Sequence, residues 1–116
     1  MDRLYPNLEE IRQQAQCSTG PGWWNIIDRI LEKIAESEPD AANINPMNVE
    51  IKEKYGTLRI YILHDSFCNP GRIEELIDSA EKESSRTCEE CGMPGKTRSI
   101  HDWYTTLCEE CAALKE

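Results

Sequence analysis

Two Cys-x-x-Cys pairs near the C-terminal end of the sequence are the residues whose types and spacing predict chemistry. Cys88 and Cys91 form the first pair, Cys108 and Cys111 form the second, and sixteen residues separate the pairs. Four thiolates arranged as a tetrahedron bind a structural zinc ion, with Zn–S distances of roughly 2.3 Å. The spacing belongs to the class C-x2-C-x15–20-C-x2-C, which is typical of zinc sites. We therefore expect one structural Zn2+ per chain, held in a zinc ribbon over residues 86–116.

The other residues that could do chemistry do not form a catalytic motif. His64-Asp65 and His101-Asp102 each place a histidine next to an acid, which suits a general base. No nucleophile at motif spacing, glycine-rich phosphate loop or HExxH helix accompanies them in the sequence. Lone histidines at the ends of elements are more often polar turn residues, and four cysteines already complete a zinc shell without His101. We therefore expect that the protein is not an enzyme.

Helical periodicity is clear in the first third of the chain. Residues 7–16 read as a short helix, with Asn7 as its N-cap and Glu10 completing a capping box. Residues 22–37 carry a stripe of large apolar side chains at helical spacing, namely Trp23, Ile27, Ile30 and Ile34. Such a stripe is more often core than binding surface, so we expect the central core helix here. An exposed tryptophan pair that anchors a partner is the alternative.

A β-hairpin is predicted next, from residues 49–53 and 57–63, with its turn near Gly56. The alternation directs the apolar side chains inward, namely Val49, Ile51, Leu58, Ile60 and Ile62. The opposite face then carries the one basic spot of the chain, formed by Lys52, Lys54, Arg59 and Tyr61. This face is either solvated, with cross-strand pairs to Glu50 and Glu53, or a functional surface.

The predicted fold class is α+β. A third helix begins at Pro70, after the N-cap Asn69, and runs to about Ser85. Two strands alone are marginally stable, so helices must cover the apolar face of the hairpin. We expect a small helix–hairpin–helix core over residues 1–85 and, packed on it, a zinc ribbon with four cysteine ligands over residues 86–116. Residues 96–100 and 103–107 should pair as strands within the ribbon.

The charge balance disfavours nucleic acid as a partner. The chain has 13 Lys and Arg against 22 Asp and Glu, a formal net charge of −9. The ribbon alone has four bases, Arg86, Lys96, Arg98 and Lys115, and six acids, Glu89, Glu90, Asp102, Glu109, Glu110 and Glu116. Binding to a phosphate backbone needs the opposite sign. A protein partner, such as a basic host protein, fits this charge better.

Hydropathy and cysteine usage bear on the compartment. No apolar run approaches the ~20 residues of a membrane span, and the N-terminus MDRLYPNLEE lacks the apolar core of a signal peptide. We therefore expect a cytoplasmic protein, whose paired cysteines bind metal and do not form disulfides. Cys17 and Cys68 have no partner at motif spacing, so each is expected to be a small buried hydrophobic residue; a redox role is the alternative.

A longer combination of motifs resembles a group of short, uncharacterised proteins of bacteriophage and bacterial genomes. Its parts are the hairpin KEKYGTLRIY at 52–61, an acidic helix, Cys-x-x-Cys-Gly with a nearby Pro-Gly, Trp103, and Leu-Cys-x-x-Cys. With the upstream Gly22-Trp-Trp, the likeness covers roughly residues 22–112 and leaves the first twenty residues outside. The resemblance implies a phage or prophage accessory protein, in the cytoplasm of the host cell. It carries over no activity and no catalytic residue.

Three functions are compatible with these patterns. The first is a protein-interaction module that modulates or inhibits host machinery, such as antiviral defence or transcription. Its candidate contact residues are Lys54, Tyr55, Arg59 and Tyr61 on the hairpin and Trp103 and Tyr104 on the ribbon, although Trp103 could instead shield the metal. The second is binding of single-stranded DNA or RNA, for which Lys96, Arg98, Trp103 and Tyr104 combine bases with aromatic rings. The third is a self-associating structural phage component.

Overall fold

A computed structural model describes residues 5–115 of the chain, so residues 1–4 and 116 of the predicted core and ribbon ranges lie outside the described residues. The fold is α+β, as predicted. Its helices and strands are α1 (Pro6–Ser18), α2 (Trp24–Ser37), β1 (Val49–Lys54), β2 (Thr57–Ile62), α3 (Pro70–Ser84), β3 (Lys96–Ile100), β4 (Trp103–Leu107) and α4 (Glu109–Lys115). Three short 3-10 turns, Pro21–Trp23, Ala41–Asn43 and Pro46–Asn48, connect them. No helix within residues 5–115 has both the length and the apolarity of a membrane span.

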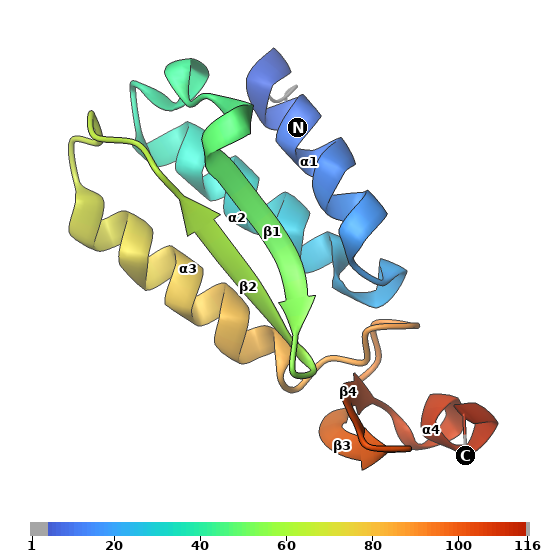
Figure 1. Cartoon of the computed structure of the whole chain (residues 1–116). Helices are drawn as coiled ribbons and strands as arrows, with labels where there is room; N and C mark the ends of the chain where they lie inside the picture. Colours follow the sequence, from blue (N-terminus) through green and yellow to red (C-terminus); the bar gives the residue numbers. More distant parts are fainter. Residues whose placement is uncertain (1–4, 116) are drawn as a thin grey trace.

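The core lies between the β1–β2 hairpin and a layer of helices. The hairpin lies over α2, with α1 along one side and α3 along the other (Figure 1). Helix α2 directs its predicted stripe into this layer, and Ile27, Ile30 and Ile34 are buried together with Trp23 just before the helix. Trp23 is 0% exposed, so the core interpretation of this tryptophan is confirmed.

The first hairpin forms where the sequence predicts it, with the predicted apolar residues on its inner face. Ile51 lies opposite Ile60, and the apolar faces of both strands point into the core. The two turn residues, Tyr55 and Gly56, have φ angles of 55° and 84°. Positive φ at both central positions is the mirror-image turn that matches the twist of paired strands. Glycine adopts it without strain, whereas Tyr55 adopts a conformation that is uncommon for its type.

Side chains from the flanking helices bond to both edges of this two-stranded sheet. On the α1 side, the Ser18 hydroxyl donates to the carbonyl oxygen of Ile51 at 2.7 Å. On the α3 side, the amide of Leu58 donates to Ser84 Oγ at 2.9 Å, and the amide of Ile60 donates to Glu81 Oε2 at 2.9 Å. Unpaired strand edges can recruit further strands, and these bonds occupy edge groups that would do so.

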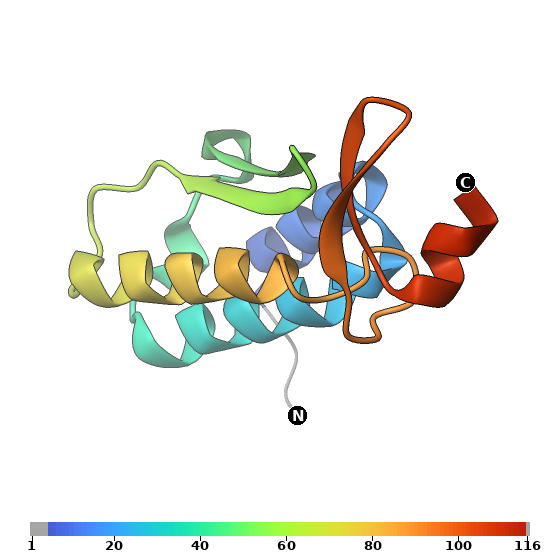
Figure 2. The same ribbon diagram turned by 90° about the horizontal axis from the view of Figure 1, so that it is seen from below.

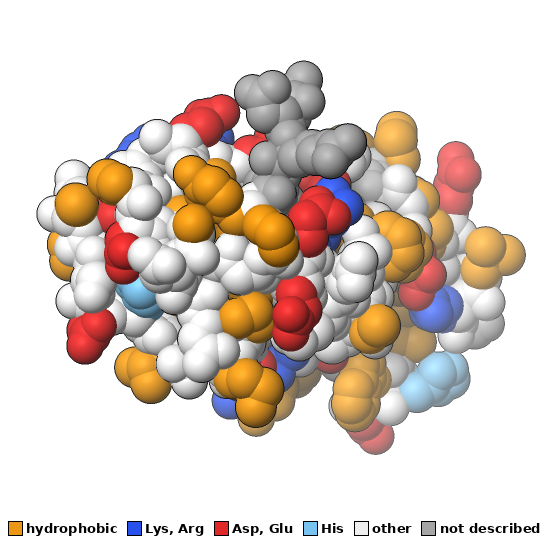
Figure 3. All heavy atoms as spheres, turned by 90° about the horizontal axis from the view of Figure 1, so that it is seen from above, with side chains coloured by type: hydrophobic (Ala, Val, Ile, Leu, Met, Phe, Trp, Pro, Cys, Tyr) orange, Lys and Arg blue, Asp and Glu red, His pale blue; other side chains and the backbone are white. Residues whose placement is uncertain are grey.

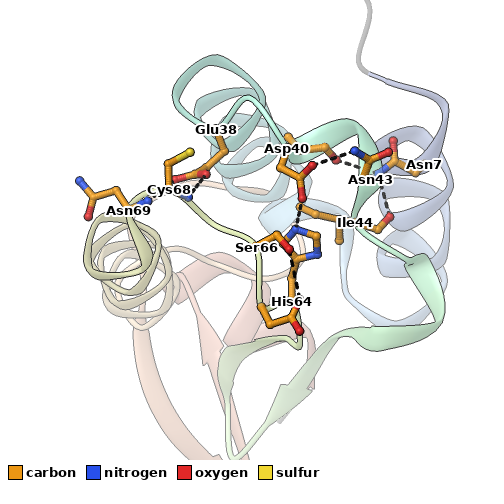
Figure 4. A network of polar contacts seen from close by, with 11 residues as sticks. Asn7, Glu38, Asp40, Asn43, Ile44, His64, Ser66, Cys68 and Asn69 are labelled. Carbon is orange, nitrogen blue, oxygen red and sulfur yellow. Dashed lines mark hydrogen bonds and ion pairs between the residues drawn. The ribbon is translucent and has the colours of Figure 1, made fainter.

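Two local predictions are wrong, and the first of them, the Asn7 cap, fails because long-range contacts compete with local ones. Helix α1 begins at Pro6, and no side chain caps it. The side-chain Nδ2 of Asn7 donates instead to the carbonyl oxygens of Ala41 and Ile44, at 2.9 and 2.8 Å (Figure 4). Cys17 and Cys68 are exposed and are therefore not small buried hydrophobic residues. In contrast, Asn69 caps α3 as predicted, since its Oδ1 accepts from the amide of Arg72 at 3.1 Å.

A polar network joins the loops at the open end of the hairpin (Figure 4). Glu38 is only 1% exposed, and its carboxylate accepts from the amides of Cys68 and Asn69 at 2.8 and 2.9 Å. His64 Nε2 lies 2.8 Å from Asp40 Oδ2. Hydrogen bonds from Asn43 and then from His64 lower the pKa of Asp40. These carboxylates hold together the loops before β1 and after β2.

The β3–β4 hairpin stands at the far end of the core, beyond the turn of the first hairpin (Figure 2). Its strands have the predicted bounds, with Lys96 opposite Leu107 and Ile100 opposite Trp103. His101 and Asp102 form the connecting turn, with φ angles of 52° and 65°. The added hairpin makes the described chain elongated, with extents of 45 × 25 × 22 Å.

Candidate metal centre

The four predicted cysteines converge at one point. The Sγ atoms of Cys88, Cys91, Cys108 and Cys111 all lie within 4.8 Å of one another. Those of Cys91 and Cys108 are 3.6 Å apart. A tetrahedron with metal–sulfur bonds of roughly 2.3 Å separates its sulfur atoms by about 3.8 Å, whereas a disulfide bond is about 2.05 Å long. All six cysteines are free, so the spacing fits a metal ion and no disulfide competes for the ligands.

Each pair of cysteines sits on a backbone turn with its own hydrogen bonds. In the first turn, the Cys88 amide donates to the Met93 carbonyl at 2.7 Å, and the Gly92 amide donates to the Cys88 carbonyl at 2.9 Å. Gly92 has a φ of 82°, which glycine adopts without steric cost. In the second turn, the Cys111 amide donates to Cys108 Sγ at 3.4 Å, just where α4 begins.

The cluster is buried on one side and open on the other. Cys88 is buried together with Leu107 and Ala112, while Cys91 is exposed. Burial acts to raise the pKa of Cys88, but backbone amides of Cys108, Cys91 and Glu90 together lower it to about 7. The neighbouring thiol of Cys108 raises the pKa of Cys111. Four sulfurs this close repel one another when ionised, and a bound cation relieves that repulsion.

The first cysteine turn packs directly on the core loop before α2. The amide of Gly22 donates to the carbonyl oxygen of Glu89 at 2.8 Å. The indole N–H of Trp23 donates to the carbonyl oxygen of Thr87 at 2.9 Å. Glycine is required at position 22, because a Cβ atom there would lie 2.0 Å from the oxygen of Cys88. The sequence predicts only a break between two helices at residues 17–22, and no pattern in it indicates this contact.

A second contact joins the two hairpins. The Thr106 hydroxyl donates to the carbonyl oxygen of Gly56, and a Cβ at Gly56 would lie 3.0 Å from the amide nitrogen of Thr105. Glu89 connects the first cysteine turn to β4, since its carboxylate accepts from the Thr105 hydroxyl and the Thr106 amide. Burial raises the pKa of this carboxyl, and the two hydrogen bonds oppose that shift.

The structure brings together some of the predicted partner-contact residues. Tyr55 and Tyr104 meet at the junction of the hairpins, with ring centroids 6.5 Å apart and nearly perpendicular planes. Lys54 Nζ lies 5.7 Å from the centroid of the Tyr55 ring. Tyr61 lies on the same outer face but towards the open end of the sheet, and Arg59 lies opposite Lys52 on the neighbouring strand.

Three details differ from the sequence-based interpretation. Lys52 pairs with Glu50 of its own strand at 3.4 Å, not across the hairpin. Glu53 lies on the core side, where its carboxylate accepts from the Gly56 amide at 2.8 Å. Trp103 is 67% exposed, and it is not part of the buried cluster around Cys88, which Leu107 and Ala112 form. Trp103 therefore does not shield the cysteines.

Neither histidine joins the cysteine cluster. The group that could hold a metal contains four cysteines, and His101 lies in the exposed turn of the β3–β4 hairpin. His64 pairs with Asp40 at the other end of the sheet. Among residues 5–115, the cysteine cluster is the one group of three or more His, Cys, Asp or Glu residues placed closely enough to hold a metal ion.

Comparisons with family models, with curated proteins and with solved structures found no match for this chain. The class of site therefore rests on its own geometry, which is that of four cysteines able to hold a metal ion at the junction of an α+β core and a small hairpin.

Proposed function

We propose that the cysteine cluster binds one zinc ion and that this ion is structural. Four thiolates whose Sγ atoms all lie within 4.8 Å of one another suit zinc, whereas magnesium, calcium and manganese prefer oxygen ligands. Cys88, Cys91, Cys108 and Cys111 would hold the ion and leave no position for a substrate. The ion would supply folding energy to the β3–β4 hairpin and no catalysis.

Metal analysis tests this assignment. Freshly purified protein should contain about one zinc per chain, and a Cys88→Ser variant should contain little. Cys68→Ser is the matched control, because Cys68 is exposed and lies outside the cluster. Iron in place of zinc would correct the metal, and a metal-free protein with wild-type folding would refute the site.

We further propose that the chain is a non-enzymatic protein-interaction module. The observation that carries this proposal is the set of large side chains exposed on a rigid framework. Tyr55, Tyr61, Trp103 and Tyr104 are exposed on the two hairpins, and backbone and side-chain hydrogen bonds fix these hairpins to each other and to the core. Exposed aromatic residues on ordered elements are frequent anchors of protein interfaces.

The resemblance noted above supports a role as a phage or prophage accessory protein in the host cytoplasm. In that role the module would modulate or inhibit host machinery, with antiviral defence or transcription as candidate targets. The net charge of −9 supports a basic protein as the partner. The same charge weighs against single-stranded nucleic acid, although the exposed Trp103 and Tyr104 could stack on bases.

Affinity capture separates these functions. The zinc-loaded chain is immobilised and exposed to host lysate, with and without nuclease treatment. A specific protein that is retained after nuclease treatment supports the interaction module. Recovery that vanishes with nuclease supports nucleic-acid binding. If nothing is retained and light scattering shows concentration-dependent association, the self-associating component is the better description.

A further inference from the structure

A groove of about 1080 Å3 lies between the sheet and α3, on the side of the core away from α1. Apolar side chains line much of it, including Val49, Ile62 and Ile77. Met47 and Leu63 extend the apolar lining at the open end of the hairpin, where they are 85% and 75% exposed. Exposed apolar residues that gather in one groove mark interaction sites more often than isolated ones do.

The charged residues of the groove are all acidic. Its described lining includes Glu50, Glu74, Asp78 and Glu81 but no Lys or Arg. Asp78 pairs with Lys82 at 3.0 Å, and this pair is exposed, so solvent screens it strongly. On the face seen in Figure 3, hydrophobic side chains lie among acidic ones, with Lys and Arg side chains beside some of the acids. The combination of apolar and acidic lining residues is complementary to a ligand that is both apolar and basic.

The α3 wall of the groove has a regular spacing. Glu74, Ile77, Asp78 and Glu81 fall at positions i, i+3, i+4 and i+7, so they form a single stripe along the helix. Seven residues of helix cover about 10.5 Å at a rise of 1.5 Å per residue. A partner helix with apolar and basic residues at the same spacing would match this stripe over two turns.

An added β-strand would not bind in the same place. The amides of Leu58 and Ile60 point from the edge of β2 towards α3, where Ser84 and Glu81 already accept their hydrogen bonds. A strand at this edge would have to displace both contacts. The groove therefore favours a ligand that docks through its side chains.

From these observations we propose that the groove between β2 and α3 binds a basic amphipathic helix of a partner protein. Leu63, Ile77 and Met47 receive its apolar face, and Glu74 and Asp78 pair with its Lys or Arg residues. This inference rests on the protein-interaction role proposed above and specifies the chemistry of the partner. Tyr61, predicted from the sequence as a contact residue, also lines the groove.

Selection from a displayed library of helical peptides with randomised surface positions tests the proposal. The bait is the full-length, zinc-loaded chain. Enriched peptides should carry Lys or Arg at positions i and i+4, matching Glu74 and Asp78, together with Leu, Ile or Met on the same face. The dissociation constant of the best synthetic peptide should rise at least tenfold when Glu74 and Asp78 are both replaced by Lys.

Two further variants keep this result specific. Glu10→Lys with Glu36→Lys changes the net charge equally, on exposed positions of α1 and α2, and should leave peptide affinity unchanged. Leu63→Ser removes an exposed apolar contact and should weaken binding without loss of thermal stability. If the Glu74→Lys/Asp78→Lys and Glu10→Lys/Glu36→Lys variants lose peptide affinity equally, the effect is one of net charge alone. That result would overturn the proposal.

Other outcomes also contradict the groove assignment. Failure to enrich any peptide, or enrichment of peptides without basic residues, would do so. So would a dimer that dissociates when Glu74 and Asp78 are replaced by Lys, because the occupant would then be a second copy of the chain. If lysate capture yields a nuclease-resistant partner that binds the Glu74→Lys/Asp78→Lys variant normally, the interaction role stands and only the groove fails. If capture yields none, the interaction role itself fails.

Discussion

Replacing Gly22 by alanine tests whether the cysteine-bearing hairpin is docked on the core. The added Cβ would lie 2.0 Å from the Cys88 oxygen, 2.6 Å from the Gly92 nitrogen and 2.7 Å from the Glu89 carbonyl carbon. All three atoms belong to the backbone of the first cysteine turn, which cannot rotate away as a side chain would. Alanine at this position therefore forces the turn and the loop apart.

The cost has two parts. Overpacking of a closely packed interior costs typically about 1–3 kcal/mol. Separation also lengthens or breaks the hydrogen bond from the Gly22 amide to the Glu89 carbonyl, which contributes about 0.5–1.5 kcal/mol. We expect a total loss of about 2–4 kcal/mol in the free energy of unfolding. For a chain of this length each kcal/mol lowers Tm by about 4 °C, so Tm should fall by about 8–16 °C.

Thermal unfolding followed by circular dichroism, together with metal content, measures this effect. Gly71→Ala is the matched control, since a Cβ there would meet only Asn69 Oδ1 at 3.7 Å. Gly71 lies in the first turn of α3, where alanine should stabilise the helix by up to about 1 kcal/mol. If Gly22→Ala unfolds at the wild-type temperature and keeps its metal, the two parts of the chain are not in contact as described.

Three other perturbations have defined outcomes. Cys108→Ser should abolish stoichiometric metal binding and unfold the β3–β4 hairpin, as metal analysis and circular dichroism would show, whereas Cys17→Ser should do neither. Glu38→Ala leaves the amides of Cys68 and Asn69 without an acceptor and should cost about 2–4 kcal/mol in urea unfolding, while the exposed Glu36→Ala should change stability by less than about 0.5 kcal/mol. Burial raises the pKa of Asp28 above its ordinary value of 3.8, although attraction to Arg12 opposes this shift. The folded state therefore binds the carboxyl proton of Asp28 more tightly than the unfolded state does. Stability then falls as the pH rises from about 3.8 through the pKa of the folded state. Asp28→Asn should therefore be more stable than the parent at pH 7 and lose this advantage below about pH 3.8; an equal advantage at pH 3 would contradict the reasoning.

Features with a strong local signal could be predicted from the sequence. The spacing of Cys88, Cys91, Cys108 and Cys111 indicates the cysteine cluster, and alternation with turn residues locates both hairpins within about a residue. Asn69 is recognisable as a cap because its partner, the amide of Arg72, lies three residues away. In each case the interacting groups are close in sequence, or the chemistry admits few alternatives.

Features that depend on distant parts of the chain could not be predicted. Asn7 has the residue type of a helix cap, but carbonyl oxygens more than thirty residues away accept its hydrogen bonds instead. In the sequence Gly22 indicates only a helix break, and only the folded chain shows that its backbone closely approaches the backbone of Cys88. The groove beside α3 likewise arises from two elements whose acidic and apolar residues look ordinary when each is read alone.

Because Gly22 and Trp23 contact the first cysteine turn, a metal ion bound by the four cysteines would stabilise the whole chain, although the helical core contributes no ligand atom. A ligand that binds only the folded form adds stability as its free concentration rises, by about 2.7 kcal/mol at one hundred times its dissociation constant. The melting temperature of the helices should therefore follow the free metal concentration. A chelator would then lower the stability of a hydrophobic core with which it makes no contact, and the folded fraction of the chain would depend on the supply of metal.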